Sequence, residues 1–305
     1  MTRPIARPIA QRTGGVDPAA GAGSRQISTG EDRAPARSNY ITGSRLQRMA
    51  ADMTALDWEL LAFVASCRLA SGRQLSVRFW LADRDSDPAR ARAARRALKR
   101  LSAWRVLDQL PGRARGGLRG GSGTLIYRVG VAGARLLAIR GLHQKRLDAP
   151  GERYVAHALA CAEMVVRLHA ADARGELEVI AVQHEPRSWR YFLGPMAARL
   201  VVRPDLFLRI GAGALEDRWF VEIDLGTEHK STIATKAAGY LAHFRSGAEQ
   251  HEHSVYPRVL WTTPDTVRTQ QLRKVFGRQP AQLQSLFSVC CFDEAIDFLA
   301  REARS

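Results

Sequence analysis

The chain has 305 residues, a hydrophobic content of 46% and a formal net charge of +16. This length suffices for two domains with a real core, and the charge predicts a polyanionic partner, double-stranded DNA before an acidic membrane surface. No apolar run is long enough to cross a bilayer, no secretory signal opens the chain, and the cysteines form no CxxC pair; we therefore expect a cytoplasmic protein with no membrane association.

Residues 1–45 consist mainly of Pro, Gly, Ala, Ser and Arg, with almost no large apolar side chains. Such a segment cannot bury enough surface to offset the entropy lost on ordering. The composition therefore predicts a disordered, mildly basic tail.

Residues 46–148 follow a helical pattern that ends in two short β-prone runs. Thr54 is a predicted N-cap with Asp57 at the third position of a capping box, Ser71 begins a second helix, and Pro88 opens a third. The runs VLDQL and TLIYRV then enclose a basic glycine loop. Three helices followed by a hairpin are typical of a winged helix-turn-helix domain.

The third of these helices is strongly basic. Ala94, Leu98 and Leu101 lie on one face at helical spacing, and cations occupy the remainder. A recognition helix and its wing would use such side chains on phosphates and base edges. The predicted DNA contacts are Arg92, Arg95, Arg96, Lys99, Arg100, Arg113, Arg115 and Arg119. A solvated cationic face and a protein-binding surface remain alternatives.

Residues 150–305 alternate between helix and strand in the order α-β-β-β-α-β-α-β-α, which predicts an α/β domain with a mixed sheet. The chain as a whole is thus a multi-domain α/β protein. Within this domain, HEH at 251–253 is assigned to a surface loop, and His157 to a solvated or capping role. The aromatic cluster at 189–192 is assigned to a packed hairpin or loop, with stacking on unpaired bases as the alternative.

Acidic side chains interrupt two apolar runs within the stretch RPDLFLRIGAGALEDRWFVEIDLG, residues 203–226. Residue numbers of facing positions in a hairpin have a constant sum; for Asp205 and Glu222 it is 427, which centres the turn at 213–214, next to Gly211 and Gly213. The spacing therefore predicts that Asp205 and Glu222 face each other, with Asp224 on the same side as Glu222.

Two facing carboxylates repel each other by about 4 kcal/mol at 4 Å and an effective dielectric of 20, so the arrangement requires a bound cation, a raised pKa or an arginine. A hard divalent cation such as Mg²⁺ or Mn²⁺ would fit oxygen ligands of this kind. Ion pairs with Arg203, Arg209 or Arg218 of the same hairpin are the alternative.

The layout of helix, PD strand, acid-bearing strand and helix resembles the PD-(D/E)XK nuclease superfamily. Residues from about 50 to 275 resemble more narrowly the replication-relaxation family of plasmid and mobile-element proteins. The matching phrases are TALDWELLAFVASCRLASGRQL, RRALKRLSAWRVLD, EPRSWRYFLGP, RPDLFLRI, WFVEIDLGTEH and ATKAAGYLAHFRSG. This resemblance implies DNA as a partner and a role in replication or DNA relaxation, alongside other replication or transfer proteins or a second copy in a homodimer.

The nuclease resemblance implies roles for particular residues. Asp205 and Glu222 would be the motif carboxylates, and Glu163 in the preceding helix an additional metal ligand beside Asp224. The superfamily's lysine position, two residues after Glu222, holds Asp224, so the lysine would come from the following helix. Lys236 is the candidate there, with Lys230 in reserve. A non-catalytic initiator or regulator with a degenerate site is the alternative.

Overall fold

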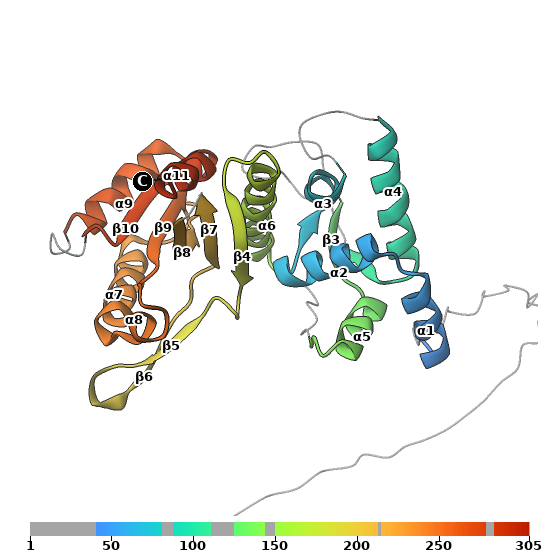
Figure 1. Ribbon diagram of the computed structural model, residues 1–305, viewed down its shortest axis with the longest axis horizontal. Coiled ribbons are helices and arrows are strands. Elements are labelled where there is room, and N and C mark those ends of the chain that lie inside the picture. The colour runs from blue at the N-terminus through green and yellow to red at the C-terminus, as the bar shows by residue number, and fades with distance from the viewer. Residues whose placement is uncertain are drawn as a thin grey trace, which may run out of the picture. The chain divides into compact units, whose positions relative to one another are not determined.

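The computed structural model describes residues 41–80, 88–110, 125–143, 150–212, 215–278 and 284–304. The segment 1–40 assigned to the tail, and the loop arginines Arg113, Arg115 and Arg119, lie outside these residues. The first part of the described chain contains mainly helices (Figure 1). Its elements are α1 (Gly43–Asp52), α2 (Ala55–Cys67), β1 (Ala70–Ser71), α3 (Gly72–Phe79), α4 (Pro88–Ala103), β2 (Leu107–Gln109), β3 (Ile126–Val129) and α5 (Val131–Ile139).

Local hydrogen bonding explains why α2 and α3 begin where the sequence predicts. Thr54 accepts from the backbone N–H of Asp57, whose carboxylate accepts from the N–H of Thr54, which completes a capping box. Ser71 and Gln74 form the same reciprocal pair at α3. Pro88 is the first residue of α4, where a missing N–H costs nothing. The sequence did not predict α1, whose first residues fall within the segment assigned to the tail.

The apolar face of α4 packs into the core of this part of the chain. Ala94, Leu98 and Leu101 are buried, and Leu98 and Leu101 lie in a cluster with side chains from α1, α2, α3 and α5. The three-stranded sheet has the order β1-β3-β2, with antiparallel pairing on both sides of β3. The packing therefore leaves the basic side of α4 facing outward.

The second part of the chain forms an α/β unit around a five-stranded mixed sheet. The strand order is β10-β9-β8-β7-β4; β4, β7 and β8 pair antiparallel, and β8, β9 and β10 pair parallel. The elements are α6 (Glu152–Ala173), β4 (Glu178–His184), β5 (Arg190–Leu193), η1 (Pro195–Ala197), β6 (Arg199–Val202), β7 (Leu206–Ala212), β8 (Leu215–Ile223), α7 (Lys230–Ser246), α8 (Ala248–His253), β9 (Arg258–Thr263), α9 (Thr266–Phe276), β10 (Phe287–Cys291), η2 (Phe292–Glu294) and α11 (Ala295–Glu302).

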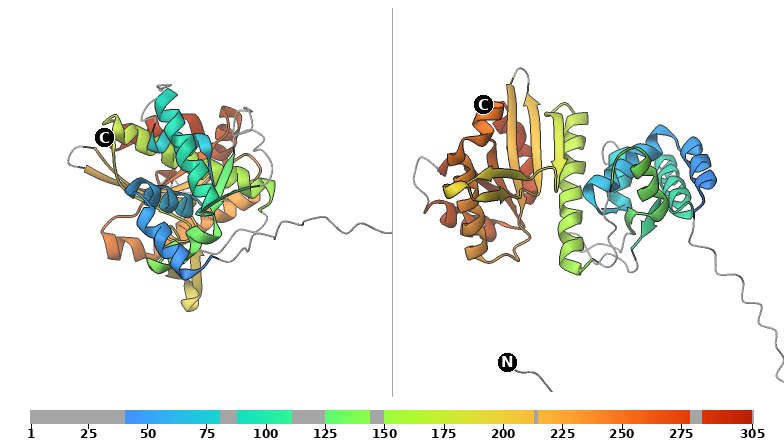
Figure 2. Two further views of the ribbon diagram at one scale, coloured as in Figure 1. Left: turned by 90° about the vertical axis from the view of Figure 1, so that its right-hand side faces the viewer. Right: turned by 90° about the horizontal axis from the view of Figure 1, so that it is seen from below.

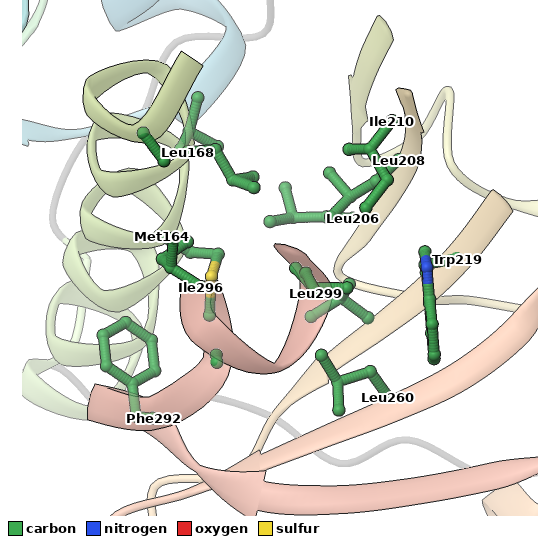
Figure 3. Close-up of a cluster of buried hydrophobic side chains, with 14 of the residues drawn as sticks. Met164, Leu168, Leu206, Leu208, Ile210, Trp219, Leu260, Phe292, Ile296 and Leu299 are labelled. Atoms are coloured by element: carbon green, nitrogen blue, oxygen red, sulfur yellow. The ribbon is translucent and has the colours of Figure 1, made fainter. Parts of the chain in front are cut away.

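Helices cover both faces of the sheet, so alternate residues of each strand enter two different cores. On one face, Leu206, Leu208 and Ile210 of β7 pack with Trp219 of β8 and with α6 and α11 (Figure 3). On the other face, a second cluster combines alternate sheet residues with α7 and α9. Figure 1 and the right-hand view of Figure 2 show α6 and the α7–α9 layer on opposite sides of the sheet. Glu222, inside β8 and between these two layers, is therefore buried.

Two features of this part differ from the prediction. The HEH segment at 251–253 lies in the short helix α8 and not in a loop. Strands β5 and β6, absent from the predicted order, form a separate antiparallel pair that leaves the main sheet between β4 and β7. Among the described residues, no helix has both the length and the apolar character needed to cross a membrane.

Candidate functional site

Charged side chains gather where β4 ends, β7 begins and β8 ends. The observed register pairs Leu206 with Val221, whose numbers sum to 427, as predicted for Asp205 and Glu222. Asp205 precedes β7 by one residue, and its Oδ2 accepts a hydrogen bond from the backbone N–H of Ile223 at 2.7 Å. This bond ties the Asp205 carboxylate to the strand that carries Glu222.

Glu222 is buried, with 2% of its surface exposed, and α7 supplies both of its hydrogen-bond donors. Lys236 Nζ lies 3.0 Å from Oε2, and the Tyr240 hydroxyl donates to Oε1 at 2.6 Å. The two donors are four residues apart and therefore share one side of the helix. Lys236 also contacts Glu228 at 2.9 Å, so its ammonium group bridges two carboxylates.

Electrostatic effects shift the ionisation of this pair in a consistent way. Burial, followed by the charge of Asp205, raises the pKa of Glu222 to about 8, even though Lys236 and Tyr240 stabilise its ionised form. Burial lowers the pKa of Lys236, but the charge of Glu222 and the bond to Glu228 outweigh it and leave that pKa above its usual value. The site therefore contains a permanent cation beside a carboxyl group that ionises with difficulty.

A third carboxylate joins the row from β4, and the sequence analysis missed it. Strands β4 and β7 pair up to His184 and Leu206, so Glu185 directly follows one strand end and Asp205 directly precedes the other. Desolvation of the Glu185 carboxyl and the charge of Asp205 raise its pKa. Its Oε1 accepts from Nε1 of Trp189 at 3.3 Å. Glu185, Asp205 and Glu222 thus form a row across three neighbouring strands.

Helix α6 contributes His157 to this row, so the expected solvated or capping role for His157 is wrong. Its Nε2 lies 3.2 Å from Oδ2 of Asp205, and its Nδ1 lies 3.8 Å from Sγ of Cys161. One ligand atom from each of these three residues falls within 4.8 Å of the others. Burial raises the pKa of Cys161 well above its usual value, so its thiol stays protonated, and the imidazole and carboxylate are the better metal donors.

The structure does not bring the other two predicted acids to this row. Asp224 is buried and accepts from Nε of Arg268 at 2.6 Å and from the N–H of Gly226 at 2.8 Å. Glu163 accepts from Gln74 at 3.1 Å and from Arg167 at 3.2 Å. Both carboxylates therefore have partners of their own.

The hairpin arginines do not neutralise Asp205 or Glu222. Arg209 and Arg218 both contact Glu216, at 2.7 and 3.0 Å. The guanidinium of Arg203 instead lies over the ring of Trp189, 5.1 Å from its centroid. Among the described residues, the partners of the central carboxylates come from α6, α7 and the backbone.

The basic face of α4 is the second candidate surface. Arg92, Arg95, Arg96 and Lys99 are exposed and form no ion pair with another residue that the structure describes. Arg100 differs, because its Nη2 lies 2.6 Å from Oδ1 of the buried Asp57 in α2. The exposed cations can meet an external anion, whereas Arg100 also joins α4 to α2.

A mixed sheet with covered faces and a row of carboxylates beside a lysine defines an α/β protein with a charged site at its strand ends. Residues 61–259 match the family model described as replication-relaxation, so the chain belongs to the replication-relaxation family. Membership suggests a role in the replication or relaxation of plasmids or mobile elements and involvement with DNA and the replication machinery.

A shorter similarity links part of the chain to a fungal enzyme. The chain is 36% identical over 113 residues to an FAD-dependent monooxygenase of Penicillium roqueforti (strain FM164). The match covers 36% of this chain and 12% of that protein. The chain thus spans about an eighth of that relative's length, which carries no argument about activity here. No solved structure matches the chain.

Proposed function

We propose that the protein binds double-stranded DNA through a winged helix-turn-helix and nicks it at the carboxylate row. The order α2, β1, α3, α4, β2, β3 supports the first half, because a winged helix presents its third helix to DNA and follows it with a hairpin. The exposed cations Arg92, Arg95, Arg96 and Lys99 on α4 supply the charge that phosphates require.

The order of elements in the second part supports a PD-(D/E)XK-like nuclease fold. Helix α6 leads into the antiparallel strands β4, β7 and β8, and helix α7 then connects β8 to the parallel strand β9. The observation that carries the proposal is the row of Glu185, Asp205 and Glu222 on three adjacent strands, with Lys236 bound to Glu222.

The residues present are suited to a divalent cation. Within the described residues, Oδ1 of Asp205 has no hydrogen-bond partner, and burial together with the charge of Asp205 raises the pKa of Glu222. Asp205 and Glu222 would hold Mg²⁺ or Mn²⁺, with Glu185 and His157 next to it. Such an ion, when bound, polarises a phosphoryl oxygen and lowers the pKa of a water molecule.

Lys236 would act by charge and not by proton transfer. Its pKa lies above the usual lysine value, so it remains an ammonium group throughout the neutral range. Held against Glu222 and Glu228, it is already oriented before a phosphate arrives. A preorganised cation of this kind stabilises the additional negative charge of a pentacovalent phosphate.

Incubation of supercoiled plasmid with the full chain and Mg²⁺ or Mn²⁺ tests this activity. We expect open-circular product from the wild type and its loss in Asp205→Asn, Glu222→Gln and Lys236→Met. Glu252→Gln, whose side chain is 75% exposed, is the matched control and should retain activity. Supercoil that persists with wild type under both metals, or nicking that survives Asp205→Asn, would refute the nuclease assignment.

One observation favours a second candidate, a non-catalytic initiator or regulator. Both oxygens of Glu222 already accept hydrogen bonds, from Lys236 and Tyr240, and Arg268 neutralises Asp224. Carboxylates satisfied internally in this way would leave no site for a cation, and the protein would bind DNA through its basic surfaces without cleaving it. DNA binding with no nicking under either metal would support this function.

A further inference from the structure

A β-hairpin arm, formed by β5, η1 and β6, projects from the main sheet (Figure 1). Its base is firmly anchored. Phe192 and Val202 are buried in the core shared with α7, Ser188 Oγ donates to the carbonyl of Pro204 at 2.6 Å, and Arg190 lies 2.7 Å from the buried Glu249 of α8. The arm is therefore a fixed projection of the α/β unit.

The arm exposes several large apolar side chains to solvent. Met196 is 100% exposed, Tyr191 71% and Leu193 63%. Met196 and the following Ala197 also have positive φ values of 54° and 57°. Residues other than glycine seldom adopt this conformation. A strained tip that presents methionine to solvent indicates a surface that is covered in use.

The charge of the arm identifies the chemistry of its partner. Residues 186–204 contain four arginines and no Asp or Glu. Glu249 neutralises Arg190, whereas Arg187, Arg199 and Arg203 are exposed. A surface that combines exposed cations with an apolar tip is complementary to a polyanion that also offers flat apolar faces, and DNA has both.

The position of the arm connects it to the carboxylate row. The arm leaves the sheet directly after Glu185 and returns directly before Asp205, so each of its roots carries one carboxylate of the candidate site. A ligand held along the arm would be close to this site.

We propose that the β5–β6 arm is a second DNA-binding element, which inserts Met196 at a base step of duplex DNA while Arg187 and Arg199 contact flanking phosphates. Apolar wedges of this type unstack a base step and kink the duplex. The arm would thereby hold the duplex so that it extends toward Glu185 and Asp205 at the roots of the arm. The inference rests on the proposed function in taking DNA as the ligand, but it concerns a different surface from α4.

The test uses the full chain and a duplex of about 30 base pairs with a fluorophore at each end, in EDTA to prevent cleavage. Energy transfer reports bending, and anisotropy reports affinity as salt is varied. Met196→Asn removes the apolar tip with a residue that tolerates positive φ, and Met196→Leu retains apolar character. Arg187→Ala with Arg199→Ala removes the proposed phosphate contacts, and Lys274→Ala with Arg278→Ala, exposed on or next to α9, is the charge-matched control.

We expect Met196→Asn to abolish the bending signal and Met196→Leu to retain it. The double arginine variant should bind about 10-fold more weakly near 150 mM salt, with a log–log salt slope smaller by about 2, while the α9 control matches wild type. If the arm variants bend DNA as the wild type does and have the same salt slope, the inference is overturned. If they change the sedimentation of the protein and not its DNA binding, the arm contacts a second copy of the chain, which also overturns the inference.

A comparison variant separates this inference from the proposed function. Replacing Arg92, Arg95 and Arg96 by Ala removes the α4 contacts and leaves the arm intact. If this variant loses affinity while the arm variants behave like wild type, the arm inference fails and the α4 assignment stands. If wild type does not bind duplex at all, both fail together.

Discussion

Replacing Glu222 by Gln should remove a pH-dependent instability from the metal-free protein. Glu222 is buried beside Asp205, and its pKa is raised from 4.5 to about 8. Gln has the same shape, retains an oxygen that can accept from Tyr240, and carries no charge. The stability of the two proteins should therefore differ most where Glu222 is forced to ionise.

The direction and size of the effect follow from proton linkage. Between pH 4.5 and about 8 the unfolded chain has released the Glu222 proton while the folded protein retains it. The unfolded state then binds fewer protons, so the free energy of unfolding falls as pH rises, by up to about 1.4 kcal/mol per pH unit. The stabilising contribution is complete below pH 4.5 and is lost above pH 8, a total on the order of 5 kcal/mol.

Urea denaturation in EDTA from about pH 4.5 to 9 measures this difference. The free energy of unfolding of Glu222→Gln, minus that of wild type, should increase steadily across the range. The exposed Glu252→Gln should show a flat difference. Added Mg²⁺ or Mn²⁺ at pH 8 should stabilise wild type and not Glu222→Gln, because the cation binds the ionised carboxylate. A flat difference for Glu222→Gln would mean that the carboxyl ionises normally and that the cluster is not under electrostatic strain.

Two further substitutions test the packing around α4 and α5. Arg100→Ala should lower the free energy of unfolding by about 1–3 kcal/mol, because Asp57 is left buried without its cation. The control Lys99→Ala, at an exposed neighbouring position, should change the free energy of unfolding by less than about 0.5 kcal/mol. Equal losses for the two variants in chemical denaturation would contradict the structural role of Arg100. Gly133→Ala would place a Cβ 2.2 Å from the backbone oxygen of Val106, so α5 must shift, and a loss of about 1–3 kcal/mol is expected; an unchanged melting temperature would show that this close approach does not exist.

Much of the fold follows from local interactions that can be recognised in the sequence. Capping side chains mark the starts of α2 and α3, Pro88 marks α4, and each effect operates within four residues. The register of β7 and β8 was predictable because only two residues separate them in the sequence, so one index sum places every pair. The contact between Lys236 and Glu222 was predictable for a related reason, since α7 directly follows β8.

The rest of the site depends on contacts between distant segments. His157 reaches Asp205 across 48 residues of sequence, and its neighbours in α6 do not distinguish it. Glu185 faces Asp205 only because β4 pairs with β7, and a bulge between Val179 and Ala181 shifts that register. No count from the start of a strand can anticipate a bulge. Helix α8 lacks an apolar face, so no periodicity indicated it; the buried pair of Glu249 and Arg190 holds it in place.

The arrangement of cations bears on the proposed nuclease motif, whose lysine position is not a lysine in this chain. Asp224 occupies that position, and Arg268 binds it in a buried pair apart from the carboxylate row. Within the described residues, Lys236 is therefore the ammonium available to Glu222, while Glu185 and Asp205 add negative charge beside it. The repulsion between these carboxylates can be relieved by a proton retained on Glu222 or by a divalent cation, and the two are mutually exclusive. If the proposed cation binds here, proton and metal would compete for the carboxyl group of Glu222.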